Sequence, residues 1–270
     1  MIVEGMLDNY VVGDQVADAG EYRLYLCKQE KTGRRCLLQI AAETSQNGPL
    51  SRSSYLLQEL KRLADELEAE YEKVRTDPKV LLNYGLGFPE LVDSFSCQPQ
   101  GGRWINILAF RKIEDVTKMV PLRNITVRDR RRVDLRTSAW ILGKSLKLLV
   151  FAHSQGIAVG RLDDANILIE PDQHYVVFYD WSKAHLYPEN VPAEIAGTEI
   201  SQVAKAIITL LGGDLERRLF PDNNEYTAFL LDLADENLRE AKRAHAKFYE
   251  LIDGLWRREF YPFTSFPLNS

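Results

Sequence analysis

The hydrophobic pattern of this chain changes near Lys112, and this change limits the possible folds more than any other feature. Before it, short apolar runs are separated by turns, as in residues 22–27, the turn at Gly33 and residues 36–41. Two such runs joined by a turn that contains glycine predict a β-hairpin. After Lys112, long segments carry apolar residues at helical spacing. The order predicts an α+β chain with a small antiparallel-sheet lobe followed by a mainly helical lobe.

The spacing of apolar residues also sets the expected bounds of the elements. One long helix with a charged outer face is expected in the sheet lobe, after a loop at residues 47–49. We place the sheet lobe at residues 1–113, and the helical lobe with an aromatic C-terminal tail at residues 114–270. The expected elements are strands at 88–96 and 104–111, and helices at 53–75, 136–154, 199–211 and 237–257.

Composition and charge argue against several classes of function. The 270 residues carry a net charge of −5, which argues against nucleic-acid binding through a basic field. The first ten residues contain no apolar core of a signal peptide, and no apolar stretch approaches the ~20 residues that span a bilayer. We expect reduced cysteines in a cytoplasmic protein and incidental histidines, because neither type has metal-ligand spacing. These residues are Cys27, Cys36, Cys97, His153, His174, His185 and His245.

A more specific signal lies in residues 153–169, which read His-Ser-Gln-Gly-Ile-Ala-Val-Gly-Arg-Leu-Asp-Asp-Ala-Asn-Ile-Leu-Ile. This segment resembles the catalytic loop of protein kinases, and Asn166 falls on the metal-binding asparagine of that loop. Asp180 stands where the family has the aspartate of Asp-Phe-Gly, and residues 11–41 resemble its Gly-rich hairpin and lysine-bearing strand. Glu199 stands where the helix after the activation segment usually opens with aspartate. The resemblance covers most of the chain and implies a bilobal protein-kinase-like fold.

In the sheet lobe, the chain departs from the family at the positions that hold the nucleotide. The loop glycines fall on Ala17, Ala19 and Tyr22, whose side chains hinder the close approach of backbone to phosphate that glycine permits. Gln39 replaces the lysine that holds the phosphates, and its amide carries no positive charge. We expect Gln39 to fill a polar gap between sheet and helix. Glu59 is the best-spaced position for the helix glutamate that pairs with this lysine in the family.

The catalytic position carries the decisive departure. Arg161 stands where the family has its catalytic aspartate, and a guanidinium that stays protonated cannot accept a hydroxyl proton. We expect Arg161 to form an ion pair with Asp180 or Asp163. Asn166 and Asp180, which the family uses to bind magnesium, are retained. They would hold a cation only through their oxygens, with Asp163 and Asp164 as further ligands.

These departures lead to a hypothesis of function that depends on the resemblance. The chain is expected to be a pseudokinase, a non-catalytic interaction or regulatory module with a protein partner, no phosphoryl transfer and no cofactor. Ala17, Ala19, Tyr22, Gln39, Asn166 and Asp180 would then line a vestigial nucleotide cleft. Two alternatives stay open. One is an unconventional ATP-dependent phosphotransferase or nucleotidyl transferase, with Mg²⁺ on Asp180 and Asn166 and a cation from Arg23 or Lys28. The other is a nucleotide-sensing domain.

Two clusters in the helical lobe fall outside the resemblance. The first is basic and predicts either a site for an anionic partner or a solvated helix entrance offset by Asp129 and Asp134. The second is the aromatic tail, in which burial of each ring could contribute about 1.5–3 kcal/mol. We expect the tail to pack along its own lobe, or to dock on a partner or a second copy of the chain. The clusters comprise Arg123, Arg128, Arg130, Arg131, Arg132 and Arg136, and Phe260, Tyr261, Phe263 and Phe266.

Overall fold

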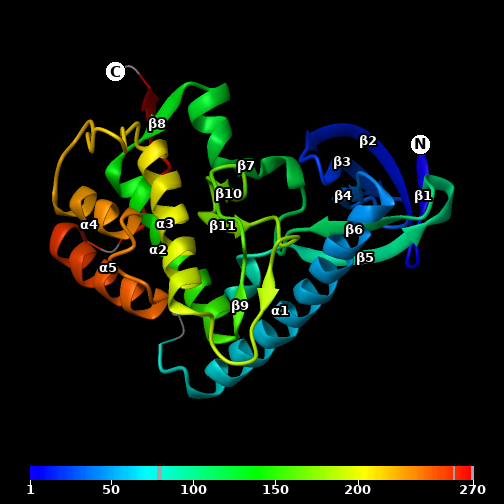
Figure 1. Ribbon diagram of the computed structural model, residues 1–270, viewed down its shortest axis with the longest axis horizontal. Helices are drawn as coiled ribbons and strands as arrows, with labels where there is room; N and C mark the ends of the chain where they lie inside the picture. Colours follow the sequence, from blue (N-terminus) through cyan, green and yellow to red (C-terminus); the bar gives the residue numbers. More distant parts are fainter. Residues whose placement is uncertain (78–80, 258, 269–270) are drawn as a thin grey trace. The chain divides into compact units, whose positions relative to one another are not determined.

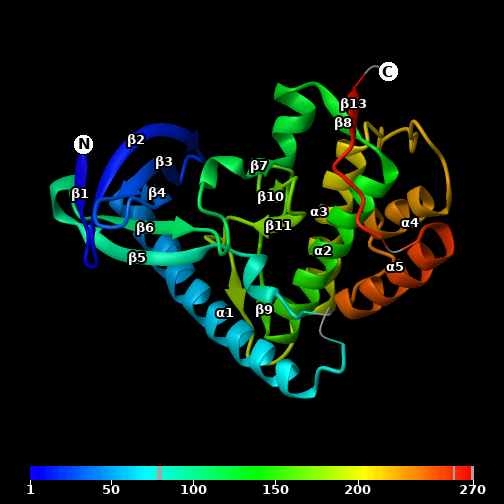
Figure 2. The same ribbon diagram turned by 180° about the vertical axis from the view of Figure 1, so that it is seen from behind.

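A computed structural model describes residues 1–77, 81–257 and 259–268. The chain divides into two compact units, shown from opposite sides in Figure 1 and Figure 2. Unit 1 comprises Met1–Lys118 and the short segment Trp181–Lys183, whereas unit 2 comprises Met119–Asp180 and Ala184–Ser270. None of the helices in the described part of the chain combines the length and the apolar character that a membrane crossing requires.

Unit 1 is built on an antiparallel sheet with the strand order β1-β2-β3-β4-β6-β5 (Figure 1). Strand β4 lies inside this sheet and is buried along its length apart from its first residue, as its continuous apolar run predicts. The core of the sheet includes Tyr10, Leu38, Ile105 and Ile107, each at most 2 % exposed. The strands span Ile2–Glu4 (β1), Asn9–Asp18 (β2), Tyr22–Gln29 (β3), Arg35–Ala41 (β4), Glu90–Cys97 (β5) and Arg103–Ala109 (β6).

Helix α1 (Asn47–Val74) packs on this sheet through β5 and β6. The prediction of a loop at residues 47–49 and a helix start at Ser53 is wrong, because Pro49 lies in the first helical turn. Proline is tolerated there, since the N–H it lacks would have no partner within the helix. The Asn47 side chain fixes the helix start by accepting a hydrogen bond from the backbone N–H of Trp104 in β6, at 2.8 Å.

Unit 2 is mainly helical and also carries short strands in two- and three-stranded sheets (Figure 2). Its central helix α2 contributes Ile141, Leu142 and Leu146, which are fully buried. The helices span Leu135–Ser154 (α2), Ala193–Leu210 (α3), Glu225–Ala234 (α4) and Ala241–Leu255 (α5), with a π-helical turn at Asn124–Arg128 (η5). The strands span Val120–Pro121 (β7), Arg131–Val133 (β8), Ile157–Ala158 (β9), Ile167–Glu170 (β10), Tyr175–Phe178 (β11), His185–Leu186 (β12) and Ser265–Pro267 (β13).

The helix boundaries in unit 2 differ from the predicted ones at their N-terminal ends. Helix α3 begins at Ala193, directly after Pro192, so Glu199 lies inside the helix rather than at its opening. Helix α4 is absent from the prediction, although Asn224 caps it by accepting a hydrogen bond from the Thr227 N–H at 3.0 Å. Pro192 and Asn224 are the N-cap residues of these two helices, directly before the first helical residue.

The aromatic tail packs on unit 2, which is the first of the two arrangements expected for it. Strand β13 pairs with β8 in antiparallel register, so the tail runs alongside β8 (Figure 2). The Tyr261 hydroxyl donates a hydrogen bond to Asp134, and the Arg136 guanidinium lies 4.2 Å from the centre of the Tyr261 ring. Arg132 lies over the Phe266 ring in the same way, at 5.5 Å. Part of the arginine cluster therefore seats the tail, a role that neither interpretation of that cluster included.

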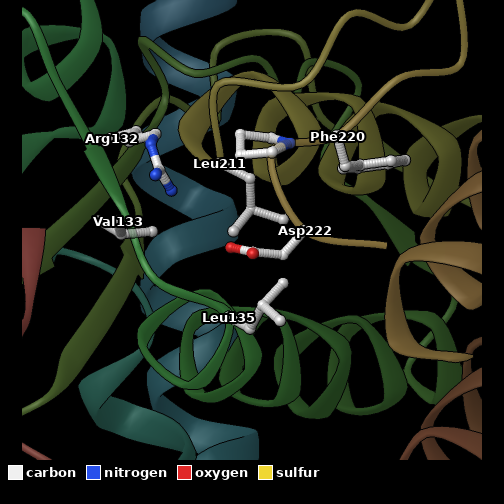
Figure 3. Close-up of a pocket in the computed structure, with 7 residues that line it drawn as sticks. Arg132, Val133, Leu135, Leu211, Phe220 and Asp222 are labelled. Atoms are coloured by element: carbon white, nitrogen blue, oxygen red, sulfur yellow. The ribbon is translucent and has the colours of Figure 1, made fainter. Parts of the chain in front are cut away.

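A small hollow lies between β8 and the segment after α3, and Figure 3 shows its lining. The Arg132 guanidinium and the Asp222 carboxylate point into it from opposite sides. Its volume of about 10 Å³ leaves room for no more than one water molecule. The hollow is therefore a packing feature, and it is too small to bind a ligand.

Candidate functional site

The loop that resembles the kinase catalytic loop connects β9 to β10 in unit 2. Arg161 lies on this loop, and its Nε is 2.7 Å from Oδ2 of Asp163. The predicted ion pair of Arg161 is thus confirmed for Asp163. The two side chains are 45 % and 42 % exposed, so solvent screens the pair and its contribution to stability is small. The guanidinium occupies the position at which the resemblance places a catalytic base.

Asn166 ties this loop to the segment that ends in Asp180. Its Oδ1 accepts a hydrogen bond from the backbone N–H of Asp180, and its Nδ2 donates to the backbone carbonyls of Asp180 and Arg161. Asn166 is 3 % exposed and Asp180 is 5 % exposed. The Asn166 amide, which would bind metal in the family, therefore has a structural function here. In the described residues no group of three or more His, Cys, Asp or Glu side chains converges on a metal position.

Glu199 supports the loop from inside helix α3. Its Oε1 accepts a hydrogen bond from the backbone N–H of Gly160 at 2.5 Å, and its Oε2 lies 2.7 Å from Nε2 of His153. Both side chains are buried, so each compensates the other for the loss of water. The expectation that His153 is incidental is wrong, since it closes this buried contact. The available signal was a carboxylate within an apolar helix, because a buried acid needs a partner.

A cavity of about 340 Å³ opens beside the loop, between it and helix α3. Arg161 and Lys205 bring positive charge to its lining, and Asp163 and Asp164 bring negative charge. Burial raises the pKa of the Asp164 carboxyl, and the neighbouring Asp163 raises it further. Gln202 from α3 closes one side by accepting a hydrogen bond from the Leu162 N–H at 2.9 Å. The lining carries balanced charge and offers no field that would attract a polyanion.

In unit 1, the turn between β2 and β3 stands where the family has its phosphate-binding loop. The Gly20 N–H donates to Oδ1 of Asp18 at 2.9 Å, with Gly20 at a φ of 78°. A carboxylate of the chain itself thus takes a donor that a phosphate would need. Ala17 and Ala19 are exposed along this turn, whereas Tyr22 is buried in the sheet.

The segment Trp181–Lys183 also belongs to unit 1 and contacts this turn. The Lys183 ammonium binds the Glu21 carboxylate at the tip of the turn. Trp181 is 1 % exposed and packs edge-on against Phe88, with their ring centres 6.3 Å apart. The residues that follow Asp180 are therefore fixed to the β2–β3 hairpin and to the core of unit 1.

Gln39 lies in a buried polar network, as predicted for a residue that fills a gap between sheet and helix. Its Oε1 accepts a hydrogen bond of 3.4 Å from Nδ2 of Asn106, which also donates to the carbonyl of Leu50 in α1 at 3.0 Å. Oδ1 of Asn106 accepts hydrogen bonds from Ser94 and Trp104, at 2.8 and 3.0 Å. The network joins β4, β5, β6 and α1 without any charged side chain.

The charged groups named as a possible cation, and the glutamate named as a partner of the family's lysine, lie elsewhere or have other contacts. Arg23 pairs with Asp18 at 3.5 Å, and Lys28 lies toward the end of β3 that is remote from the turn. Glu59 pairs with Arg62 on its own helix, and the hydrogen bond from Arg62 lowers the pKa of Glu59. Among the contacts of the described residues, none joins Arg23, Lys28 or Glu59 to Gln39.

The residues that the resemblance assigns to Mg²⁺ and ATP do not fit those ligands. In unit 1, the donor of the turn is taken by Asp18 and the lysine is replaced by a neutral amide. In unit 2, the Asn166 amide is bonded to backbone, and an arginine stands where phosphoryl transfer requires a base.

Comparison with known proteins identifies the fold. No protein-family model and no curated protein matches the sequence. Among solved structures, the BubR1 kinase domain is similar with a TM-score of 0.60 and 10 % identity, over 94 % of this chain and 83 % of that chain. Vaccinia related kinase 3 is similar with a TM-score of 0.62 and 12 % identity, over 94 % and 90 %. At such identities the similarity shows the fold alone, and it confirms the predicted α+β, protein-kinase-like fold.

Proposed function

We propose that this chain, which has a protein-kinase-like fold, is a pseudokinase that acts as a non-catalytic interaction or regulatory module for a protein partner. The observation that carries this proposal is Arg161, which stands at the position of the catalytic base and pairs with Asp163. A guanidinium remains protonated at any pH at which the protein is folded, so it cannot take a proton from a substrate hydroxyl. It also repels a magnesium ion from the adjoining positions.

The contacts at the other positions that bind nucleotide or metal in protein kinases support the same proposal. Gly20, Gln39 and Asn166 each direct polar groups to partners within their own unit. A nucleotide would have to break these bonds before forming its own, at about 0.5–1.5 kcal/mol for each neutral bond and about 1.5–3 kcal/mol for the bond to Asp18. Nucleotide binding is therefore opposed in both units, independently of the missing base.

A series of thermal unfolding measurements tests the proposal. The protein is heated with ATP alone, with ATP and Mg²⁺, and with ATP and Mn²⁺, and we expect the same Tm in each. A ligand at 100 times its Kd would stabilise the fold by about 2.7 kcal/mol, which is readily detected. A nucleotide-sensing domain would show such a shift, and the shift would disappear in Asp180→Ala.

A transfer assay with labelled ATP tests the remaining alternative, an unconventional transferase. We expect no autophosphorylation and no transfer to generic substrates, because no general base is present. Arg161→Asp is the matched variant, and restoring this acid alone should not create activity while Gln39 and the Ala17–Tyr22 turn are unchanged. Transfer by the parent protein that is lost in Asp180→Ala would contradict the proposal and support an unconventional transferase.

A further inference from the structure

A second cavity lies in unit 2, and its lining residues differ from those of the cavity beside the catalytic-like loop. It has a volume of about 170 Å³ and is formed by α2, α5 and the start of the tail. Helix α2 supplies Trp140 and Lys144, helix α5 supplies Phe248, and the tail supplies Tyr261. The cavity thus forms only when the tail lies against the helices.

One side of this cavity is lined by residues of an aromatic stack. The Trp140 and His174 rings are stacked with centres 4.3 Å apart and planes 2° apart. The Phe260 ring of the tail stacks on the other face of His174, with centres 4.4 Å apart. Trp256 and Tyr261 add further rings to the lining. Both faces of the His174 ring are covered by neighbouring rings, so an aromatic ligand would contact this ring edge-on, an arrangement that also adds to the free energy of burial.

Two buried polar atoms in this stack lack hydrogen-bond partners. Neither Trp140 Nε1 nor His174 Nε2 has a partner among the described residues, although each atom is inaccessible to bulk solvent. A buried polar group left unsatisfied costs about 1–3 kcal/mol. Most buried polar groups in proteins have partners, so such exceptions indicate a missing water or ligand.

The side chains that line the cavity carry a net positive charge. Arg136, Lys144 and Arg257 line it together with a single carboxylate, that of Glu259. Glu259 pairs with Arg136 at 3.3 Å, whereas no described carboxylate lies within ion-pair distance of the Lys144 ammonium. The surrounding atoms exclude enough water to lower the pKa of Lys144. An ammonium ion beside an apolar wall without a counter-ion favours an anionic ligand.

The volume limits the size of that ligand. A cavity of about 150 Å³ holds a benzene ring, so about 170 Å³ accommodates one ring system with a short acidic arm. A nucleotide or a long acyl chain is too large. We propose that this cavity binds a small aromatic carboxylate, with its ring against the Trp140–His174 stack and its carboxylate on Lys144.

Tryptophan signals provide the test, because the four tryptophans divide evenly between the two units. Trp140 and Trp256 line the cavity, whereas Trp104 and Trp181 belong to unit 1. The indole N–H signals of ¹⁵N-labelled protein are recorded while indole-3-acetate is added. We expect the Trp140 and Trp256 signals to shift and those of Trp104 and Trp181 to stay in place. No shift at millimolar probe, or equal shifts of all four signals, would overturn the proposal.

Two matched comparisons test the recognition of the carboxylate. Indole-3-acetamide has the same ring without the charge, and we expect it to bind at least about tenfold more weakly. Lys144→Met should weaken indole-3-acetate binding by a similar factor, whereas Lys242→Met, an equal charge change on the exposed side of α5, should not. Unchanged melting curves would show that both variants fold. Equal affinity of Lys144→Met and the parent protein would overturn the assignment of Lys144.

Discussion

Two regions of unit 2 place polar groups close to apolar surfaces, and they differ in where those groups find partners. In the loop region around residues 153–166, Asn166, Arg161 and Glu199 all bind other parts of the chain. In the cavity beneath the tail, Trp140 Nε1 and His174 Nε2 have no described partner. Most polar groups described in the loop region are thus paired within the chain, with His153 Nδ1 as an exception, whereas the tail cavity has two such buried atoms and an ammonium without a described counter-ion.

The difference teaches where ligand binding is favourable. A ligand gains little at a site whose polar groups must first give up existing bonds, and it gains more where it supplies the first partner to a desolvated group. We therefore expect a small-molecule site in the tail cavity rather than beside the loop that resembles a catalytic loop. The resemblance still locates the loop correctly, because the same contacts hold the loop in shape.

The largest effect in this comparison is expected when the buried carboxylate of the loop region, that of Glu199, is removed. Glu199→Ala leaves His153 and the Gly160 N–H without their acceptor inside the protein. We expect a loss of about 3–5 kcal/mol in the free energy of unfolding, as for other broken buried pairs. Denaturant unfolding gives this value. Glu194→Ala, on the exposed first turn of the same helix, should change it by less than about 0.5 kcal/mol. A loss below about 1 kcal/mol for Glu199→Ala would show that the loop does not depend on this contact.

Removing the tail tests the second region, which is the cavity formed by α2, α5 and the tail. Deletion of residues 259–270 removes β13, the Tyr261–Asp134 bond and one wall of the cavity. We expect a lower Tm, corresponding to about 2–3 kcal/mol for the burial of its partly buried rings, and loss of indole-3-acetate binding. Light scattering should show a monomer before and after the deletion. Unchanged stability together with dissociation of an oligomer would mean that the tail works between chains instead.

A smaller change isolates one bond of the tail. Tyr261→Phe removes the hydroxyl that donates to Asp134, and we expect a loss of about 1 kcal/mol near neutral pH. This bond raises the pKa of Tyr261. Because the folded-state pKa lies above the unfolded value, the stabilisation is complete below the ordinary tyrosine pKa of about 10 and is lost as the pH rises through the folded value. The difference between variant and parent should therefore shrink in alkaline buffer. Tyr55→Phe, on the exposed face of α1, should show no such difference at any pH.

The smallest expected effect is an increase in the free energy of unfolding, whereas the changes above decrease it. Lys144 has a lowered pKa in the folded protein, so folding disfavours its charged form. The resulting penalty is present at neutral pH and disappears only as the pH rises above the pKa of the unfolded chain. Lys144→Met should therefore raise the free energy of unfolding by less than about 0.5 kcal/mol, because the residue keeps partial contact with solvent, which screens its charge. Calorimetry without ligand would detect it. A clear loss of stability would show that Lys144 has a structural partner.

The fold class could be predicted from the sequence because it depends on the period of apolar residues, which is a local property. The residues at which the helices begin are harder to predict from the sequence. The prolines at Pro49 and Pro192 are compatible with a loop and with the first turn of a helix, and only the packing of the following residues decides between them. Positions within the loop, such as Arg161 and Asn166, were found because their spacing is fixed by the short strands that flank them.

Contacts between distant segments could not be predicted in the same way. Glu199 reaches His153 from another helix, so no local spacing connects the two residues. The tail cavity has the same origin, because α2, α5 and the tail are separate segments of the sequence that meet only in the fold. Lys144 occupies a position on α2 where a lysine is normally solvated, and only the approach of neighbouring rings makes its charge unusual.

The membership of Trp181–Lys183 in unit 1 has a consequence for how the protein is made. A ribosome adds about 5–20 residues per second and releases N-terminal segments first. Residues 1–118 emerge early, but the core of unit 1 also contains Trp181, whose ring packs on Phe88. Unit 1 therefore cannot reach its final packing until much of unit 2 has also been synthesised. Its nascent form exposes Phe88 in the meantime, which is the kind of surface that chaperones bind. A recombinant fragment that stops at Lys118 would carry the same defect permanently.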